Sequence, residues 1–401
     1  MQINRDFLKI FTADFLARSA YQMGKTPLLP ILALSLGASD AYLGFIVSVS
    51  TLTGMFLKPL IGILSDRDGR RRWLIIGTLF FALMPFVYWF VHTPTQLFII
   101  RIVHGLATAI YGPVTLAYVA EQKKSHTAER LGWFGLARSG GYIVGPALAG
   151  WLLLYIDPVM VFTIVGFISC LTFIPVMSLP ETLPVTKDEP KEPLKTQFKE
   201  AMLAGSKTPA IWLAGGLEAA AYIGLYALKA FLPIYALSLG VNTAVVGLFF
   251  SLQETVHIIF GPLGGRLGDK YGYIPMIALG MMVLGGTLPL LGLWDSATTL
   301  LALSLLLGLS QALIFSSTVA LISERVDKKN LGAGLGFLGT LQNGGKVAGP
   351  VLGGLLITYL DYQISFYVLG GFLLLGALLL GGYSYWRSRP QEISGPTAAG
   401  N

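Results

Sequence analysis

The chain has 401 residues, of which 54% are hydrophobic and only 12% are charged. Soluble globular proteins carry about 25% charged residues, so this deficit along the whole length predicts an integral membrane protein and excludes a soluble enzyme. The net charge of +7 does not indicate nucleic-acid binding, because the basic residues lie in short loops between apolar runs.

Apolar runs follow one another along the chain, and about 20 such residues are enough for a helix to cross a bilayer. The runs cover, in order, residues 7–35, 41–64, 73–92, 96–120, 129–156, 159–179, 209–239, 243–267, 274–294, 298–323, 330–358 and 363–386. We expect a helix in each run, because a helix satisfies its own backbone hydrogen bonds in lipid. The sequence therefore predicts twelve transmembrane helices.

Lysine and arginine gather in alternate loops between these runs. The basic loops hold Arg67, Arg70, Arg71, Arg72, Lys123, Lys124, Arg130, Arg266, Lys270, Arg325, Lys328 and Lys329. The loops on the other side contain neither residue type. Because basic loops stay on the cytoplasmic side, we expect a multi-pass protein of the cell membrane with both termini in the cytoplasm.

The second half of the chain repeats the first. Residues 30–37 match residues 233–240 at all but one position, an offset of 203. The repeat predicts an N-terminal six-helix half at 1–179, a cytoplasmic linker at 180–207, a C-terminal six-helix half at 208–388 and a disordered tail at 389–401. The predicted fold class is an all-α membrane protein whose two pseudo-symmetric halves enclose a midplane substrate site, as in transporters.

One turn and two helix motifs carry a family resemblance. The turn from Gly62 to Arg72 resembles the signature between the second and third helices of the major facilitator superfamily. Leu97, Arg101 and Gly105 resemble its fourth-helix motif, with His104 where the family often has glutamine. The fifth-helix antiporter motif is matched by Gly132, Gly141, Gly145, Pro146, Ala149 and Gly150. The chain therefore resembles the twelve-span drug:proton antiporters, which implies the major facilitator fold and multidrug efflux coupled to protons.

The resemblance also implies a conformational latch at the turn. Asp66 would bind the start of a neighbouring helix and hold the outward-open state, since a carboxylate is stabilised near a helix N-terminus. The alternative is a helix cap or a local ion pair with Arg70. A second, weaker copy lies 203 residues later. The predicted latch residues are Gly62, Asp66, Arg67, Gly69, Arg70 and Asp269.

Glycine and proline recur at matching positions of the fifth and eleventh predicted helices. These residues are Gly145, Pro146, Gly349 and Pro350. They fit close helix packing, because small residues let backbones approach. They also fit a hinge, because each proline removes a backbone hydrogen bond. Both interpretations remain open.

Charges inside the predicted helices need a reason, because one at a helix centre costs about 2.5–3.5 kcal/mol on insertion scales. Asp14 and Arg18 are four residues apart, which fits a structural ion pair or a proton-binding acid beside a cation. Glu254 and His257 are one turn apart, which fits a proton relay or a hydrogen-bonded pair. The predicted proton-coupling residues are Asp14, Glu218, Glu254 and His257.

Basic and aromatic residues inside the helices form the predicted substrate site. Arg138 and Lys346 lie at nearly symmetric depths in the two halves, which favours an anionic or zwitterionic substrate group unless nearby carboxylates neutralise them. Tyrosines at the same depth line an amphipathic pocket or pack between helices. The predicted substrate-binding residues are Arg18, Arg101, Arg138, Lys229, Lys346, Tyr142 and Tyr222.

These features favour a secondary active transporter that exports an amphipathic organic compound in exchange for protons by alternating access. The alternatives are an importer or facilitator of an organic anion or sugar, a lipid or lysolipid translocator, and a non-transporting receptor. Cys170 is the single cysteine, and the sequence predicts neither a metal site nor a cofactor. The expected partners are a small-molecule substrate, protons and the lipid bilayer, without nucleic acid, and we expect a monomer.

Overall fold

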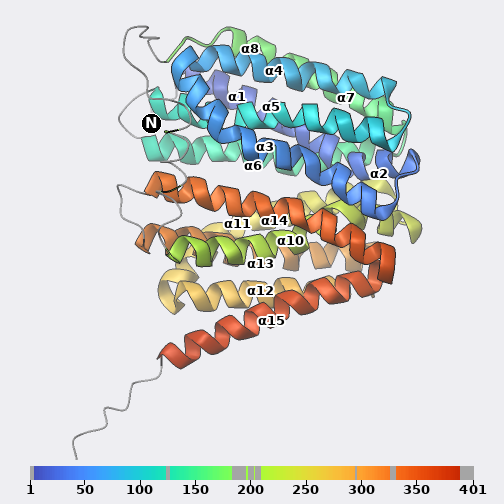
Figure 1. Cartoon of the computed structure of the whole chain (residues 1–401), viewed down its shortest axis with the longest axis vertical. Coiled ribbons are helices and arrows are strands. Elements are labelled where there is room, and N and C mark those ends of the chain that lie inside the picture. The colour runs from blue at the N-terminus through green and yellow to red at the C-terminus, as the bar shows by residue number, and fades with distance from the viewer. Residues whose placement is uncertain are drawn as a thin grey trace, which may run out of the picture.

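The computed structural model describes residues 4–122, 127–182, 196, 203, 209–293, 296–325 and 331–388. Most of the predicted linker at 180–207 and all of the predicted tail at 389–401 lie outside these residues. The halves on either side of the linker form two layers of helices, the first half above the second in Figure 1.

The first half contains six membrane-crossing segments. Its helices are α1 (Arg5–Lys25), α2 (Leu28–Ser35), α3 (Asp40–Asp68), α4 (Arg70–Val87), η1 (Tyr88–Phe90), α5 (Pro94–Glu121), α6 (Thr127–Leu152), α7 (Pro158–Leu171) and α8 (Phe173–Met177). Three pairs, α1 with α2, α4 with η1 and α7 with α8, each make one segment.

The second half contains six segments, each of them a single helix. They are α10 (Pro209–Ser238), α11 (Thr243–Tyr271), α12 (Tyr273–Leu290), α13 (Ala297–Arg325), α14 (Leu331–Leu360) and α15 (Tyr362–Ser388). All twelve segments coincide with predicted spans, so the predicted all-α membrane fold is confirmed. Among the described helices, nine candidate spans are long and apolar enough to cross a membrane. The segments α1–α2, α6 and α14 are not among these nine and carry interior charges.

The two ends of the bundle differ in how the chain turns. At one end, helices begin at side chains that accept hydrogen bonds from their first turns: Ser39, Thr93, Asp157 and Asn242. At the other, Gly69 (φ 94°) alone joins α3 to α4, and Gly272 (φ 93°) alone joins α11 to α12. Only glycine adopts this conformation without strain, which explains the repeated glycine in the sequence.

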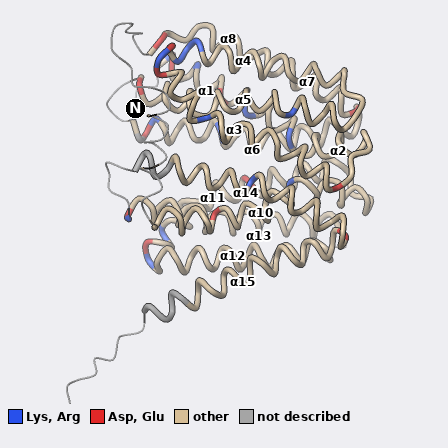
Figure 2. The backbone as a smooth tube through the Cα atoms, viewed as in Figure 1, with Lys and Arg blue, Asp and Glu red and all other residues tan. Residues whose placement is uncertain are grey.

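We call the end with Gly69 and Arg70 the arginine-rich end, and the other the opposite end. Figure 2 shows charged residues gathered at the arginine-rich end, with a smaller set in the interior of the bundle. The first described residues also lie at the arginine-rich end (Figure 1). The interior charges are unusual, because a charged side chain within a membrane-spanning helix is costly.

The halves meet where α3 crosses α14 and where α6 crosses α11. A Cβ on Gly44 would lie 2.2 Å from the carbonyl oxygen of Pro350, and one on Gly247 would lie 2.3 Å from that of Pro146. The helices therefore touch backbone to backbone, which only glycine permits. Ser48 Oγ reinforces the first crossing by donating to the Val347 carbonyl at 2.9 Å.

These crossings close the bundle towards the opposite end. There, Tyr362 donates to Asp40 Oδ1 at 2.8 Å, across the two halves. One buried apolar cluster also draws residues from both halves, for example Leu43 and Phe231. Near the arginine-rich end, by contrast, a Cβ on Gly135 of α6 or Gly339 of α14 would meet no atom within 4 Å. Within the described residues, the halves are in close contact towards the opposite end, whereas α6 and α14 face open space at these two glycines near the arginine-rich end.

Candidate functional site

A carboxylate in the first half lies between two arginines. Asp14 is fully buried, with Oδ1 3.5 Å from Arg18 Nε and Oδ2 3.9 Å from Arg138 Nε. Neither carboxylate oxygen accepts a hydrogen bond from the described residues. The group is therefore an ion-paired cluster with one excess positive charge, built from α1 and α6.

A carboxylate in the second half has neutral partners instead. Glu218 on α10 is fully buried and accepts hydrogen bonds from Thr318 Oγ1 on α13 and Gln342 Nε2 on α14. It forms no ion pair with any residue that the structure describes. Its nearest counter-charge acts at longer range, from Lys346 on α14. The carboxylate is therefore balanced by hydrogen-bond donors and not by a close cation.

Glu254 and His257 form the one-turn pair that their spacing predicts. His257 Nδ1 lies 3.4 Å from Glu254 Oε1, and the imidazole packs edge-on against Phe315 at 5.6 Å. Glu254 also interacts electrostatically with Lys229 and Lys346. The pair therefore borders the middle of the bundle.

Three lysines surround one tyrosine at the centre of the bundle. The ammonium groups of Lys25, Lys229 and Lys346 lie 5.1, 5.4 and 5.9 Å from the centroid of the Tyr226 ring. Lys25 belongs to α1 in the first half, whereas the other two belong to α10 and α14. We call these three residues with Tyr226 the lysine cage. Like charges around one ring repel each other, so the cage costs free energy unless an opposite charge balances it.

A fourth lysine lies beside the cage in the first half. Lys58 on α3 interacts electrostatically with Lys25 and Arg18. It also interacts electrostatically with Lys346 on α14. Lys25 and Lys58 are not among the site residues predicted from the sequence. Both lie inside predicted spans, where any charge marks a functional candidate, so their position was the signal that could have found them.

Positive charge therefore predominates inside the membrane-crossing segments. The interior basic residues are Arg18, Lys25, Lys58, Arg101, Arg138, Lys229 and Lys346, and the interior acidic residues are Asp14, Glu218 and Glu254. Seven cations thus face three carboxylates. A buried charge is tolerated only when it is paired or solvated, so this excess marks the centre of the bundle as a candidate functional site.

Aromatic rings form one wall beside the cage. Tyr222 stacks on Phe315 at 4.7 Å, and its other neighbour is Tyr226 at 5.8 Å. Lys346 Nζ lies 4.2 Å from the Tyr222 centroid, within cation–π distance. Tyr142 reaches the cage from the first half, 5.9 Å from Lys229 Nζ. The predicted tyrosines therefore do lie beside the predicted cations.

Arg101 makes its hydrogen bonds outside the cage, although its charge acts on Lys25. It is 1% exposed and donates to Ser50 Oγ at 2.6 Å and to the Tyr88 hydroxyl at 3.4 Å. The Tyr88 hydroxyl in turn contacts His104 Nδ1 at 3.2 Å. Arg101 therefore sits in a polar network internal to the first half, with no carboxylate partner among the described residues.

The predicted hinge residues lie at close helix contacts. A Cβ on Gly145 would meet Gln22 Cβ of α1 at 2.6 Å, and one on Gly349 would meet the Ile223 carbonyl of α10 at 2.5 Å. Pro146 and Pro350 follow directly and present their carbonyl groups at the crossings of the halves. Close packing is thus evident at all four positions, and hinge action remains a prediction.

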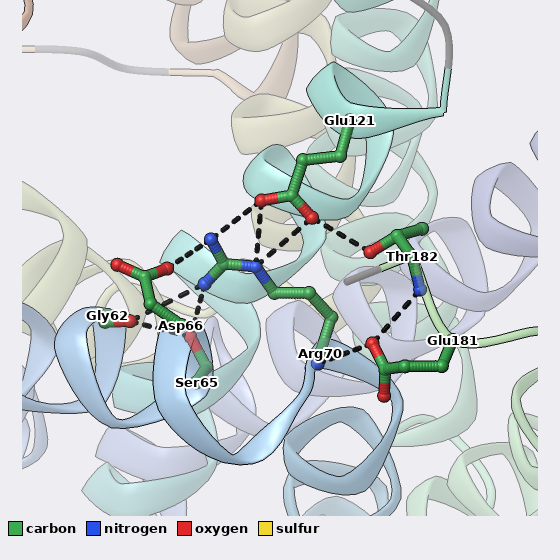
Figure 3. Close-up of polar contacts among 7 residues, drawn as sticks. All are labelled: Gly62, Ser65, Asp66, Arg70, Glu121, Glu181 and Thr182. Atoms are coloured by element: carbon green, nitrogen blue, oxygen red, sulfur yellow. Dashed lines mark hydrogen bonds and ion pairs between the residues drawn. The ribbon is translucent and has the colours of Figure 1, made fainter. Parts of the chain in front are cut away.

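The arginine-rich turn is organised around Arg70 (Figure 3). Its guanidinium donates to Ser65 Oγ at 2.6 Å and Glu121 Oε1 at 2.7 Å, and forms an ion pair with Asp66. The Gly62 carbonyl accepts from Ser65 Oγ at 2.8 Å, and Arg67 is half-buried beside it. Asp66 therefore pairs within its own half in this conformation.

Glu181 lies at the start of α4, beside the same turn. Its carboxylate accepts from the backbone N–H groups of Arg70 at 2.8 Å and Arg71 at 3.1 Å. A carboxylate is stabilised at a helix N-terminus by the unpaired N–H groups there. A Cβ on Gly69 would lie 2.5 Å from Glu181 Oε2, so this contact also requires glycine. Glu181 is not among the residues predicted from the sequence.

The second copy of the turn keeps the backbone and changes the partners. Gly272 has the same dihedral angles as Gly69, φ 93° and ψ 143° against φ 94° and ψ 143°. Asp269, however, accepts a hydrogen bond from the Tyr273 hydroxyl at 2.9 Å. Both predicted latch carboxylates therefore have partners within their own halves.

Two six-helix halves, closed at one end around a charged and aromatic midplane, define a multi-pass membrane transporter rather than an enzyme. The sequence profile of the Major Facilitator Superfamily matches residues 11–221 and 214–400. The chain belongs to the Major Facilitator Superfamily.

Individual relatives agree with this assignment. An uncharacterized MFS-type transporter of Methanocaldococcus jannaschii is 26% identical over 334 residues, 82% of this chain and 86% of the relative. Multidrug resistance protein 1 of Bacillus subtilis is 24% identical over 347 residues, 85% of this chain and 87% of the relative. The crystal structure of the nucleoside transporter NupG superposes with a TM-score of 0.76 at 16% identity, covering 94% of this chain and 99% of that one. This last likeness establishes the fold alone.

Proposed function

We propose that the protein is a secondary active transporter that exports an amphipathic organic compound in exchange for protons. The observation that carries the proposal is the lysine cage. It joins Lys25 of the first half to Lys229 and Lys346 of the second, in a bundle whose halves are in close contact towards one end. A midplane site shared by two halves is the arrangement that alternating access requires.

Orientation and location are part of the proposal. The arginine-rich end carries the basic loops, so it faces the cytoplasm by the positive-inside rule. We take this conformation to be open to the cytoplasm, ready to load a compound for export. We place the protein in the cell membrane, with residues 1–179 and 208–388 as the two moving halves, 180–207 as the cytoplasmic linker and 389–401 as the tail.

Glu218 is the strongest candidate for proton coupling. A buried carboxyl with hydrogen-bond donors but no ion pair pays a large desolvation cost when charged and a small one when neutral. Its partners Thr318 and Gln342 lie on α13 and α14. A change in the charge of Glu218 is therefore felt by three helices of the second half. Glu254 with His257 is the second candidate, and Asp14, which lies between Arg18 and Arg138, is the third.

Export of amphipathic compounds is supported by similarity to a named relative and by the residue types in the site. The relative from Bacillus subtilis carries the name multidrug resistance protein, and the fifth-helix motif of this chain resembles that of antiporters. Cations beside stacked aromatic rings suit a compound with one polar group and one flat apolar body.

In the latch proposal, Asp66 leaves Arg70 and binds across the halves when the opposite end opens.

Transport in proteoliposomes tests the proposal. The full chain is reconstituted with a pH-sensitive dye inside, and compounds from an aromatic panel are added under an imposed pH gradient. We expect compound-dependent proton flux that Glu218→Gln abolishes and that Lys9→Gln leaves unchanged, because Lys9 pairs with Asp6 near the arginine-rich end. Compound flux that is indifferent to the pH gradient would contradict proton coupling. Binding without any flux would contradict transport.

A further inference from the structure

We propose that the lysine cage binds an anionic group, so that the substrate is an organic anion: a carboxylate, sulfonate or phosphate on an apolar or aromatic body. The inference rests on the proposed function and narrows its substrate class. The substrate must then carry a negative group at the cage, which export of amphipathic compounds in general does not require. The carrying residues are Lys25, Lys58, Lys229 and Lys346.

The interior carboxylates are already engaged. Asp14 is shared by Arg18 and Arg138, Glu218 by Thr318 and Gln342, and Glu254 contacts His257 at 3.4 Å. None of the four lysines forms an ion pair with a residue in the described part of the chain. Glu254 and Glu218 act on them only at longer range. The counter-charge that the lysines lack must therefore come from water, ions or a ligand.

The aromatic rings alone do not explain the lysines. An aromatic ring attracts a cation over its face, and it has two faces. Tyr226 is surrounded by three ammonium groups within 5.9 Å of its centroid. Lys25 also donates to Thr51 Oγ1 at 3.4 Å, lies 5.6 Å from the centroid of the Tyr21 ring and interacts electrostatically with the Tyr21 hydroxyl. Mutual repulsion remains, and an anion between the ammonium groups removes it.

The wall beside the cage fits the rest of such a substrate. Tyr222, Phe315 and Tyr226 form a continuous aromatic surface adjoining Lys346. A flat apolar body can stack there while its anionic group reaches the ammonium groups. The ligand is thereby defined by two features at once, a negative head and an aromatic tail.

The cage also gives the anion a part in the conformational cycle. Lys25 and Lys58 lie in the first half, and Lys229 and Lys346 lie in the second. Without a ligand, like charges on the two halves oppose closure of the arginine-rich end. A bound anion attracts both sets, so it favours the occluded state that must precede release on the other side.

Matched probes test the inference on the purified full chain in lipid nanodiscs. The probes are 2-naphthoate, 2-naphthalenesulfonate, the neutral 2-naphthamide and the cationic 2-naphthylmethylammonium, measured by titration calorimetry. They share one aromatic body and differ in charge. We expect the two anions to bind at least tenfold more tightly than the amide, and the ammonium compound to bind least.

Variants assign the binding to the cage. Lys229→Gln and Lys346→Gln should each weaken 2-naphthoate binding roughly tenfold to a hundredfold, with little change for 2-naphthamide. Lys346→Arg keeps the charge and should retain most of the affinity, which separates loss of charge from loss of folding. Lys9→Gln, at the arginine-rich end, is the matched control and should bind like the parent chain. Size-exclusion profiles check that each variant is folded.

The outcomes separate this inference from the proposed function. Equal binding of anion and amide, unaffected by Lys346→Gln, overturns the anion cage even if proton-driven flux of other compounds persists. Lysine-dependent anion binding without proton-driven flux supports the cage and overturns proton-coupled export. Preference for the ammonium probe overturns the cage outright.

Discussion

Asp14 and Glu218 occupy equivalent positions in the first helices of the two halves, 204 residues apart, yet their partners differ in charge. Asp14 lies between two arginines, one of them Arg138 on α6. Glu218 accepts a hydrogen bond from Gln342 on α14, again 204 residues beyond Arg138. The same helix contact thus carries an ion pair in one half and a neutral amide in the other. The two halves therefore share the position of this contact but differ in the charge of the partner residue.

This difference predicts effects of different size on stability when the two acids are neutralised. Asp14→Asn leaves two buried arginines without their counter-charge, and removing one partner of a buried ion pair costs about 3–5 kcal/mol. Glu218→Gln keeps one acceptor oxygen for Thr318, and Gln342 can turn its own amide to accept from the new NH2 group. The cost is therefore about 1 kcal/mol or less. We expect a clearly lower apparent Tm for Asp14→Asn and a small change for Glu218→Gln, measured by thermal unfolding in detergent.

A double variant supplies the control. Adding Arg138→Gln to Asp14→Asn removes one unpaired cation and copies the amide found at Gln342. Most of the lost stability should return. If the double variant is less stable than Asp14→Asn alone, the charge argument is wrong and the cost of the single change lies in packing.

The fold was predictable because lipid imposes few solutions. Each apolar run had to be a helix of membrane-spanning length, and all twelve are present. The repeated glycines also marked real constraints, since Gly69 and Gly272 both require positive φ. One detail escaped the pattern. The offset of 203 at Pro30 and Pro233 becomes 204 at Asp14 and Glu218, and the first half places its extra residue in the break between α1 and α2.

The candidate site was only half predictable. The sequence showed which charges are buried, but not which ones meet, because partners lie far apart along the chain. Glu218 contacts Thr318 and Gln342 at separations of 100 and 124 residues, and no periodicity carries such contacts. Lys25 and Lys58 were overlooked because they belong to no family motif. They matter because they lie close to Lys229 and Lys346, and only the three-dimensional structure shows this.

The crossing of α6 and α11 predicts a conformational effect of a single methyl group. Gly247→Ala places a Cβ 2.3 Å from the Pro146 carbonyl oxygen and 3.0 Å from Gly150 Cα. Backbone atoms cannot rotate away, so the halves must separate at the opposite end. Overpacking of this kind costs about 1–3 kcal/mol, which shifts a two-state equilibrium roughly fivefold to 150-fold. Spin labels at the exposed positions Leu248 and Trp151 should report a longer distance by pulsed electron paramagnetic resonance.

Gly265→Ala is the control for this change. It lies on the same helix, and the nearest atom to its Cβ would be Ser316 Cβ at 4.0 Å, an ordinary contact. The distance distribution should match that of the parent chain. A lengthened distance in Gly265→Ala as well would attribute the effect to loss of helix flexibility and not to the crossing.

The latch predicts a shift in the other direction. Asp66 is 55% exposed on its side chain where it pairs with Arg70, and an exposed ion pair contributes about 0–1 kcal/mol. If Asp66 binds a helix N-terminus across the halves in the other conformation, Asp66→Asn loses about 0.3–1 kcal/mol there, or more if partly buried. We expect a two- to fivefold enrichment of the conformation open at the arginine-rich end, reported by labels at Trp133 and Leu263 in a Cys170→Ser background.

Asp269, in the second copy of the turn, provides the control for this experiment. Asp269 accepts a hydrogen bond from Tyr273 in its own half and lacks the neighbouring arginines. Asp269→Asn should therefore shift the population less than Asp66→Asn does. Enrichment of the state closed at the arginine-rich end by Asp66→Asn would show that the Asp66–Arg70 pair, and not a latch, is the dominant interaction.

Charge movement tests the anion cage and the proton site together. Exchange of one outward monovalent anion for one inward proton carries two charges in the same electrical sense. Each charge couples to the membrane potential by about 2.3 kcal/mol per 100 mV, about fiftyfold in the equilibrium substrate ratio. The reversal potential of 2-naphthoate flux in proteoliposomes, clamped with potassium and valinomycin, should give two charges per substrate. In Glu218→Gln the proton no longer moves, and any residual anion flux should carry one charge. A value of one in the parent chain would mean that anion transport and proton transport are separate, because an anion that crosses alone carries one charge.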